Sequence, residues 1–349
     1  MRSEDIAKLA GVSRSTVSRV INNYPDIPQK TREKVLKIIE QYHYEPNTSA
    51  RVLAGKGTNT IGFFVVSLAE QPNVNRIYQN NYFAPFVDAV IDTANAAGYY
   101  VLVHTVYSKE DFVKVKQAFL QKRIDGGIIV GTQKDIDTVR DIGGLGMPLV
   151  LIDYDIGEIM EHHLDQNHLA IVNSKDYEGA TAAMEYLIGL GHREIGFIAG
   201  RPATFSGRQR ARAYEDALQR HGLPVEEAFR LKGEFLKHNA YEEAIRLVRG
   251  QRLPTAIFSA NDDMAIAAIE ALKEHGIRVP EDMSVIGFDD VPVASQIVPS
   301  LSSVRLPIYD MSKEAVNKIV AMCEAGLNAF GTSSFPTQLI VRDSCRSLP

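Results

Sequence analysis

The chain has 349 residues, of which 45% are hydrophobic and 23% charged, and its formal net charge is −5. This length predicts two or three domains, and the composition is that of a globular protein rather than a disordered or membrane-spanning one. Cys323 and Cys345 are too few for a disulfide framework and lack metal-ligand spacing, so no metal and no cofactor are expected.

Charge is unevenly distributed along the chain. Residues 1–57 contain ten Lys and Arg against six Asp and Glu, so the acidic excess lies in the remainder. A small basic segment on an acidic body fits a protein that contacts nucleic acid at one end, although so mild an excess also arises by chance. Glu4 and Asp5 stand where a signal peptide needs apolar residues, and no apolar run approaches ~20 residues, which predicts a cytoplasmic protein.

Two short helices are predicted at the start of the chain, with an Ala-Gly-Val-Ser turn between them at residues 10–13. Gly11 gives this tight turn its backbone freedom, and Ser13 caps a second helix from about 14 to 21. The apolar residues of that helix face inward at helical spacing, which leaves a polar outer face. The residues of this outer face are Arg14, Ser15, Ser18 and Arg19.

A third helix from about 29 to 42 has an apolar stripe of Val35, Leu36, Ile38 and Ile39, so that three helices share one small core. The simplest alternative is a three-helix bundle whose arginines are merely solvated. The order of capped helix, tight turn and polar-faced helix favours instead a helix-turn-helix that reads DNA bases.

Residues 3–57 resemble the headpiece of the LacI/GalR family of bacterial transcription regulators. The resemblance rests on the segments Asp5-Ile6-Ala7, Ala10–Ser13, Thr16–Asn22, Tyr44–Asn47 and Ala50–Lys56. It implies a DNA-binding headpiece over residues 1–46 and a hinge helix with linker over 47–59, in which Leu53 enters the minor groove. The residues that it implies for DNA contact are Ser13, Arg14, Ser15, Thr16, Ser18, Arg19, Asn22, Arg51, Leu53 and Ala54.

From residue 60 onward, predicted strands alternate with predicted helices. The predicted strands are 61–67, 99–103, 126–130, 149–152, 195–199, 256–258 and 284–287. The predicted helices are 83–97, 111–121, 179–190, 208–221, 240–249, 263–275 and 311–323. This alternation predicts an α/β fold of doubly wound parallel sheets, with ligands bound at the carboxyl ends of the strands.

The body is similar to the periplasmic-binding-protein-like (type I) core of the same family. The segments that carry this likeness are 191–195, 210–214, 260–262, 287–290 and 336–342. The resemblance implies a ligand-binding and dimerisation core over 60–349. One lobe would span about 60–173 and 304–332, and the other about 174–303 and 333–349.

Several polar residues directly follow predicted strands and should converge on a cleft. Asp153, Asn261, Asp262 and Asp289 hold such positions, and Arg210 lies in the helix after a strand. Asp262 is as often a helix cap as a ligand. By resemblance, the expected ligand contacts are Tyr82, Phe83, Asp153, Arg210, Phe235, Asn261 and Asp289, although Phe235 could also belong to the core.

Two stretches depart from the family pattern. The segment 68–81 is longer than usual, which weakens the alignment of Tyr82 and Phe83, and Leu306 stands where some sugar-responsive members carry a polar residue.

The leading hypothesis is therefore a repressor that binds palindromic operator DNA as a homodimer and responds to a small polar ligand, for which a sugar or sugar derivative is the favoured class. The absence of a C-terminal heptad segment favours a dimer. A nucleoside or purine effector, a transport-type sugar receptor and an enzyme are the alternatives, of which the missing signal peptide and catalytic motifs disfavour the last two. The sequence identifies no protein co-regulator.

Overall fold

The computed structural model describes residues 1–21, 23–44, 57–67, 80–131, 136–161, 168–325 and 331–349. These residues form two compact units, Met1–Thr58 and Asn59–Pro349, which are taken separately below. Among the described residues, no helix is both long and apolar enough to span a bilayer.

The first unit is built from three helices, α1 (Ser3–Ala10), α2 (Arg14–Ile21) and α3 (Gln29–Gln41). Gly11 ends α1 in the left-handed region, with φ of 63°. The core consists of Ile6, Ala7, Ala10, Val17, Val20 and Val35. The predicted stripe of α3 is only partly correct, because Leu36 is 46% exposed while Ile38 and Ile39 pack against the core.

The second unit contains a six-stranded sheet in which all neighbours run parallel. Its strands, in chain order, are β1 (Thr60–Val66), β2 (Tyr100–Val106), β3 (Gly126–Gly131), β4 (Leu149–Ile152), β5 (Leu169–Ser174) and β11 (Thr332–Phe335). They lie in the order β11-β5-β4-β3-β1-β2, so β2 is one edge and β11 the other.

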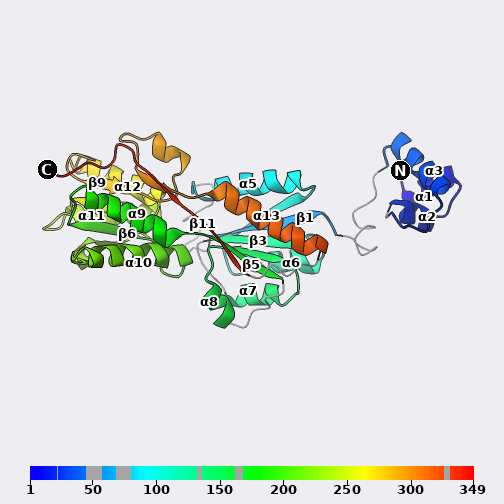
Figure 1. The fold of residues 1–349 in the computed structure, drawn as a ribbon, viewed down its shortest axis with the longest axis horizontal. Coiled ribbons are helices and arrows are strands. Elements are labelled where there is room, and N and C mark those ends of the chain that lie inside the picture. The colour runs from blue at the N-terminus through cyan, green and yellow to red at the C-terminus, as the bar shows by residue number, and fades with distance from the viewer. Residues whose placement is uncertain (22, 45–56, 68–79, 132–135, 162–167, 326–330) are drawn as a thin grey trace. The chain divides into compact units, whose positions relative to one another are not determined.

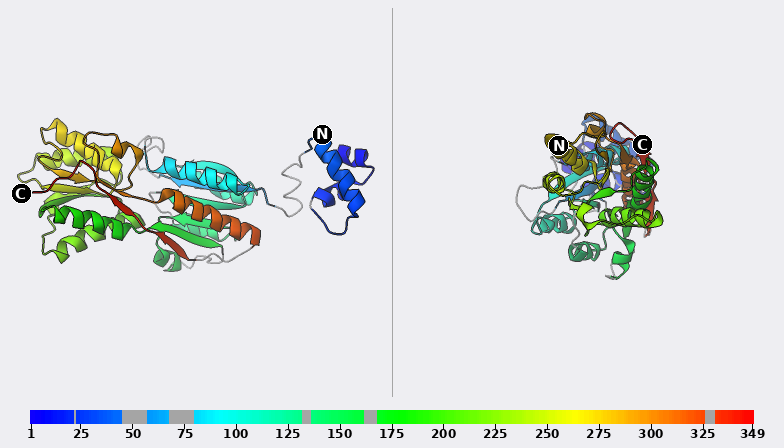
Figure 2. Two further views of the ribbon diagram at one scale, coloured as in Figure 1. Left: turned by 45° about the horizontal axis from the view of Figure 1, so that its top comes forward. Right: turned by 90° about the vertical axis from the view of Figure 1, so that its left-hand side faces the viewer.

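Helices cover both faces of this sheet, as Figures 1 and 2 show. On one face, α5 (Phe83–Ala96) and α13 (Ile308–Ala325) lie side by side over a core that includes Phe63 and Val130. On the other face, α6 (Asp111–Leu120), α7 (Ile136–Gly143) and α8 (Ile156–Glu161) cover a core that includes Phe64 and Ile129. Strands buried on both faces explain the continuous apolar runs in the sequence.

A four-stranded parallel sheet forms the rest of this unit. Its strands are β6 (Ile195–Ala199), β7 (Arg230–Lys232), β8 (Ala256–Ser259) and β9 (Ser284–Ile286), in the order β7-β6-β8-β9. Helices α9 (Asp176–Gly189) and α10 (Phe205–Arg220) pack together, as do α11 (Lys237–Val248) and α12 (Asp262–Glu274).

The C-terminal segment links the two sheets. Strand β10 (Ser303–Arg305) pairs antiparallel with β12 (Gln338–Ile340), whereas β11, which lies between them in sequence, pairs with β5 of the six-stranded sheet. Residues 333–335, which the resemblance assigned to the second lobe, therefore belong to the six-stranded sheet. Ser174 also ends a strand of that sheet, one residue beyond the expected boundary.

The predicted α/β class and parallel sheets are confirmed. Strands β4 and β6 occupy the predicted residues, and the other five predicted strands match β1, β2, β3, β8 and β9 within a few residues. Strands β5, β7, β10 and β11 and helices α7 and α8 were not predicted.

Candidate functional site

A cavity of about 360 Å³, measured to its open mouth, lies in the second unit at the carboxyl ends of strands from both sheets. Gly131 ends β3 and Asp153 follows β4, while Asn261 follows β8 of the other sheet. The residues that line the pocket are Asn80, Tyr82, Gly131, Asp153, Thr204, Ser206, Arg210, Phe235, Asn261 and Asp289. Its mixture of aromatic and polar walls suits a small polar molecule.

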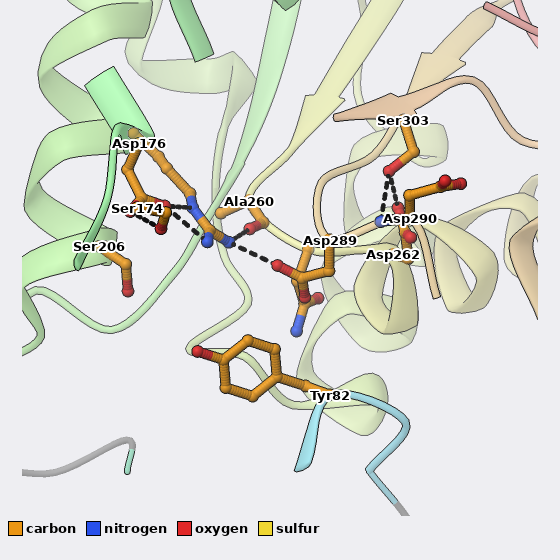
Figure 3. A network of polar contacts seen from close by, with 12 residues as sticks. Tyr82, Ser174, Asp176, Ser206, Ala260, Asp262, Asp289, Asp290 and Ser303 are labelled. Carbon is orange, nitrogen blue, oxygen red and sulfur yellow. Dashed lines mark hydrogen bonds and ion pairs between the residues drawn. The ribbon is translucent and has the colours of Figure 1, made fainter. Parts of the chain in front are cut away.

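Arg210 is the centre of a buried polar network. Figure 3 labels three of its partners, Asp176, Ala260 and Asp289. Its side chain is 3% exposed, and its Nε donates to Asp176 Oδ1 at 2.7 Å. Nη1 donates to the carbonyl oxygen of Ala260 and, at 3.2 Å, to Asp289 Oδ1. The guanidinium also lies over the Phe288 ring, 3.7 Å from its centroid. A buried guanidinium bound in this way is fixed in position at the wall of the pocket.

Burial shifts the pKa values of two pocket residues, Asp289 and Tyr82. Burial raises the pKa of Asp289 to about 7 against the opposing attraction of Arg210, and the Asp176 carboxylate adds to the rise. Burial also raises the pKa of the Tyr82 phenol well above its usual value, so this hydroxyl stays protonated. Asp289 can therefore present either a carboxylate or a carboxylic acid near neutral pH.

Three residues of the pocket wall have left-handed backbones although none is glycine. Their φ angles are 67° at Asp153, 62° at Phe235 and 105° at Asp289. A bulky residue rarely adopts this region, and such strain clusters at ligand sites, where surrounding structure fixes it.

Asp153 and Asn261 face the pocket but already have partners within the protein. Ser206 donates to the Asp153 carboxylate from its backbone N–H at 2.6 Å and from its hydroxyl at 2.9 Å. These two bonds join the loop after β4 of the six-stranded sheet to the N-terminus of α10. A helix N-terminus favours a negative charge such as the Asp153 carboxylate. Asn261 caps α12, because its Oδ1 accepts from Met264 N at 2.9 Å, and the residue also lines the pocket.

Phe235 and Phe83, the other two aromatic residues expected to contact the ligand, differ in their placement. Phe235 lines the pocket, is 9% exposed, and packs against Gly200, where an added Cβ would lie 2.3 Å from its ring. Phe83 does not line the pocket: it is fully buried in the core under α5, with its ring edge-on to Tyr82 at 5.2 Å. The expected ligand role of Phe83 thus gives way to packing, because α5 turns that side chain toward the sheet.

Several residues of the pocket and of the polar network around Arg210 were missed by sequence reasoning. Thr204 and Ser206 precede and begin α10, and Thr204 caps it by accepting from Gly207 N at 3.0 Å. Asp176 begins α9, accepts from Ser174 Oγ at 2.6 Å and pairs with Arg210. The predicted helices begin at residues 208 and 179, so Thr204, Ser206 and Asp176 lie outside them, and the strand before Asp176 was not predicted.

Asp262 and Asp290 are adjacent in sequence to the pocket residues Asn261 and Asp289, but their carboxylates bond to other parts of the fold. Asp262 accepts from Ser303 Oγ at 2.6 Å and from Val291 N at 2.8 Å, and burial raises its pKa well above the usual range. Asp290 pairs with Arg305 at 2.7 Å and Arg342 at 2.6 Å. The side chains of Asp289 and Asp290 therefore point in different directions (Figure 3).

The first unit carries the other predicted site on α2. Ser13, Arg14, Ser15, Ser18 and Arg19 are exposed and Thr16 is half-buried, while Val17 and Val20 fill the core. Ser13 Oγ accepts from Thr16 N at 3.1 Å, which caps α2. Asn22, Arg51, Leu53, Ala54 and most of the segment 68–81 lie outside the described residues.

Family models match both ends of the chain. Residues 4–47 match "Bacterial regulatory proteins, lacI family", and residues 184–345 match "Periplasmic binding protein-like domain". Among curated proteins, the "Probable HTH-type transcriptional repressor ExuR" of Bacillus subtilis is 35% identical over 347 residues, covering 99% of this chain and 98% of the relative. The "HTH-type transcriptional repressor PurR" of Haemophilus influenzae strain Rd is 31% identical over 352 residues, with the same coverage.

Solved structures give the same picture. A "transcriptional regulator CelR-cellobiose complex" is 28% identical with a TM-score of 0.73, and 99% of each chain is covered. The Lac repressor dimer bound to operator and the anti-inducer ONPF is 26% identical with a TM-score of 0.80, and 98% of each chain is covered.

Proposed function

The chain belongs to the LacI family of bacterial regulatory proteins, and on that basis we propose that its first unit binds DNA and its second unit binds the controlling ligand. The protein is a transcriptional repressor controlled by a small ligand. The observation that supports this division best is one chain with an exposed polar face on α2 and a separate polar pocket around Arg210.

The DNA-binding role falls to α2. Ser15, Ser18 and the arginines Arg14 and Arg19 would contact base edges and phosphates from the major groove, since all four are exposed. Ser13 and Thr16 would contact phosphates at the start of the helix. The roles of Asn22, Arg51, Leu53 and Ala54 rest on the family resemblance alone.

The effector is a sugar or sugar derivative. Arg210, Asn261 and Asp289 supply donors and acceptors that suit neighbouring hydroxyl groups, and Phe235 and Tyr82 offer apolar ring faces. Cellobiose is bound by one structural relative, which supports a sugar here. A purine is the second candidate, because the flat rings of Phe235 and Tyr82 also suit a heterocycle.

A thermal-shift screen tests the effector class. The panel contains glucose, galactose and cellobiose, their acidic counterparts glucuronate and galacturonate, and the purines adenine, guanine and hypoxanthine. A ligand at a hundredfold its Kd adds about 2.7 kcal/mol to stability, so one sugar should raise Tm by several degrees.

Two variants show whether the shift arises in the pocket. Asp289→Asn should abolish the shift, whereas Asp343→Asn, which removes an exposed carboxylate bonded to Ser300, should retain it. A shift with purines alone would replace the sugar proposal by the purine one. A Tm shift that persists in Asp289→Asn would show that the ligand binds outside this pocket.

We propose that the repressor is a homodimer that works in the cytoplasm, where its DNA is. Strand β2 is an edge of the six-stranded sheet, yet Tyr100 is 75%, Leu102 38% and Val103 40% exposed. An exposed apolar edge strand is a surface that pairing with a second copy would cover. Tyr100→Lys should convert dimer to monomer in light scattering, and an unchanged mass would exclude this edge.

We propose binding rather than catalysis at the pocket. The neighbouring carboxylates Asp289 and Asp290 are held by different arginines and point apart, so they do not form an acid/base pair across a shared substrate bond. Incubation of the protein with the sugar that shifts its Tm should leave that sugar unchanged by chromatography.

A further inference from the structure

The turn that follows α2 is folded back against the helix. Arg32 of α3 donates from Nη1 to Asn23 Oδ1 and from Nη2 to the Tyr24 carbonyl oxygen, both at 2.5 Å. Tyr24 N donates in turn to the carbonyl oxygen of Arg19 at 3.0 Å. Asn23 has φ of 56°, a region that Asn adopts more readily than most residues. These contacts fix the side chains of the turn relative to α2.

Two side chains of this turn hold Arg19. Its Nη2 forms an ion pair with Asp26, and its guanidinium lies 5.5 Å from the centroid of the Tyr24 ring. The Arg19 side chain is nevertheless 46% exposed. DNA can therefore reach this guanidinium, but it must either displace the Asp26 carboxylate or bind beside it.

The other outward arginine of α2 is held more loosely. Nη1 of Arg14 lies 3.4 Å from Oε1 of Glu4, and the two side chains are 65% and 57% exposed. Within the described part of the chain, no aromatic ring stacks on the Arg14 guanidinium. Arg19 is thus the more constrained of the two arginines.

We propose that Asp26 is a specificity-determining residue that acts through Arg19. The guanidinium is a fork of five donors, so one edge can stay on Asp26 while the other binds the paired acceptors of guanine. A phosphate of non-cognate DNA also accepts hydrogen bonds from a guanidinium, but it carries negative charge as Asp26 does. The two anions repel each other, so the phosphate must draw Arg19 away from Asp26. Asp26 therefore lowers affinity for non-cognate DNA more than for the cognate site. This inference rests on the proposed role of α2 in DNA binding.

The first test measures binding of the full-length protein to a random-sequence 30-base-pair duplex by fluorescence anisotropy over a range of salt concentrations. Asp26→Asn is compared with Glu33→Gln, which also removes one negative charge from the same unit but whose carboxylate accepts from Gln29 at 2.9 Å. Asp26→Asn should bind about two- to fivefold more tightly than Glu33→Gln, the range expected for release of an exposed ion pair. Its slope of log affinity against log salt should be steeper by about 0.9, for one added phosphate contact.

The second test selects bound sequences from a pool of randomised duplexes. Asp26→Asn should recover the wild-type motif with a weaker guanine preference at one position of each half-site, and Asp26→Glu should restore that preference. The inference is overturned if Asp26→Asn and Glu33→Gln agree in both tests, or if Asp26→Asn loses binding to all duplexes. If the wild type selects no motif at all, it is the role of α2, rather than that of Asp26, that fails.

Discussion

At the scale of single residues, the pocket buries charge that water would otherwise solvate. Arg210, Asp176 and Asp289 are each almost fully buried, and a buried charge is tolerable only when it is paired and hydrogen-bonded. A ligand that bonds to Asp289 or Arg210 enters a network that is already ordered, which lowers the entropic cost of binding.

Asp289 should make stability depend on pH. Its pKa of about 7 in the folded protein lies above the usual 3.8, so folding favours the protonated form. The stabilising contribution is complete below about pH 4 and is lost as pH rises toward 7. Urea unfolding from pH 4.5 to 8 should show wild type losing stability relative to Asp289→Asn by at most about 1.4 kcal/mol per pH unit. A difference between the two proteins that is constant across pH would contradict this expectation.

Gly200 should limit the position of Phe235. Because an added Cβ would lie 2.3 Å from the Phe235 ring, Gly200→Ala should cost about 1–3 kcal/mol by overpacking. Gly189→Ala is the matched control, since a Cβ there meets nothing within 4 Å at the end of α9. Equal unfolding free energies for the two variants in urea would refute the steric argument.

At the scale of elements, one residue ties three segments together. The Asp290 carboxylate joins the loop after β9 to Arg305 at the end of β10 and to Arg342 after β12. These segments lie next to the connections between the two sheets. Its neighbour Asp289 faces the pocket, so one turn of backbone contacts both the ligand site and the connecting strands.

Removal of the Asp290 charge should therefore be costly. Its side chain is 4% exposed, and Asp290→Asn should destabilise the protein by about 3 kcal/mol because a buried pair loses one partner. Asp282→Asn removes an exposed carboxylate that is also paired with an arginine, Arg278, and should have little effect. Chemical denaturation of both variants provides the comparison, and similar losses would show that Asp290 is no more than a surface partner.

The contrast between β4 and β7 shows which kind of strand the sequence predicts. Strand β4 is recognisable from four consecutive apolar residues, whereas β7 is the segment Arg-Leu-Lys, whose strand geometry comes from pairing with β6. Tertiary pairing, rather than local preference, forms such a strand.

The same contrast applies to the site. Residues that directly follow apolar strands, such as Asp153 and Asn261, were predicted to face the pocket and do line it. Tyr82 and Phe83 are adjacent in sequence, yet the start of α5 directs one toward the pocket and the other into the core. Neighbouring aromatics at a helix start cannot be separated by pattern alone.

At the scale of the whole molecule, repression requires that ligand occupancy change DNA affinity. That coupling is a free energy shared by two sites, so each site must be measurable independently of the other.

The family resemblance suggests one substitution that should affect DNA binding without affecting ligand binding. Leu53→Ala should weaken binding to the selected operator more than tenfold while leaving the sugar-induced thermal shift unchanged, because an inserted wedge acts only on the duplex. Anisotropy and thermal shift measure the two effects, and an equal loss of both would refute the wedge assignment.

The place of β11 has a consequence for synthesis of the protein. The four-stranded sheet and its helices are formed by the continuous stretch 176–286, which is complete well before the chain ends. The six-stranded sheet receives β11 at residues 332–335 and its covering helix α13 at 308–325. A growing chain would thus finish the half encoded in the middle first, while the half encoded earlier waits with one apolar face covered by α5 but not yet by α13. That waiting period is when a ribosome-bound chain of this protein should most need chaperones.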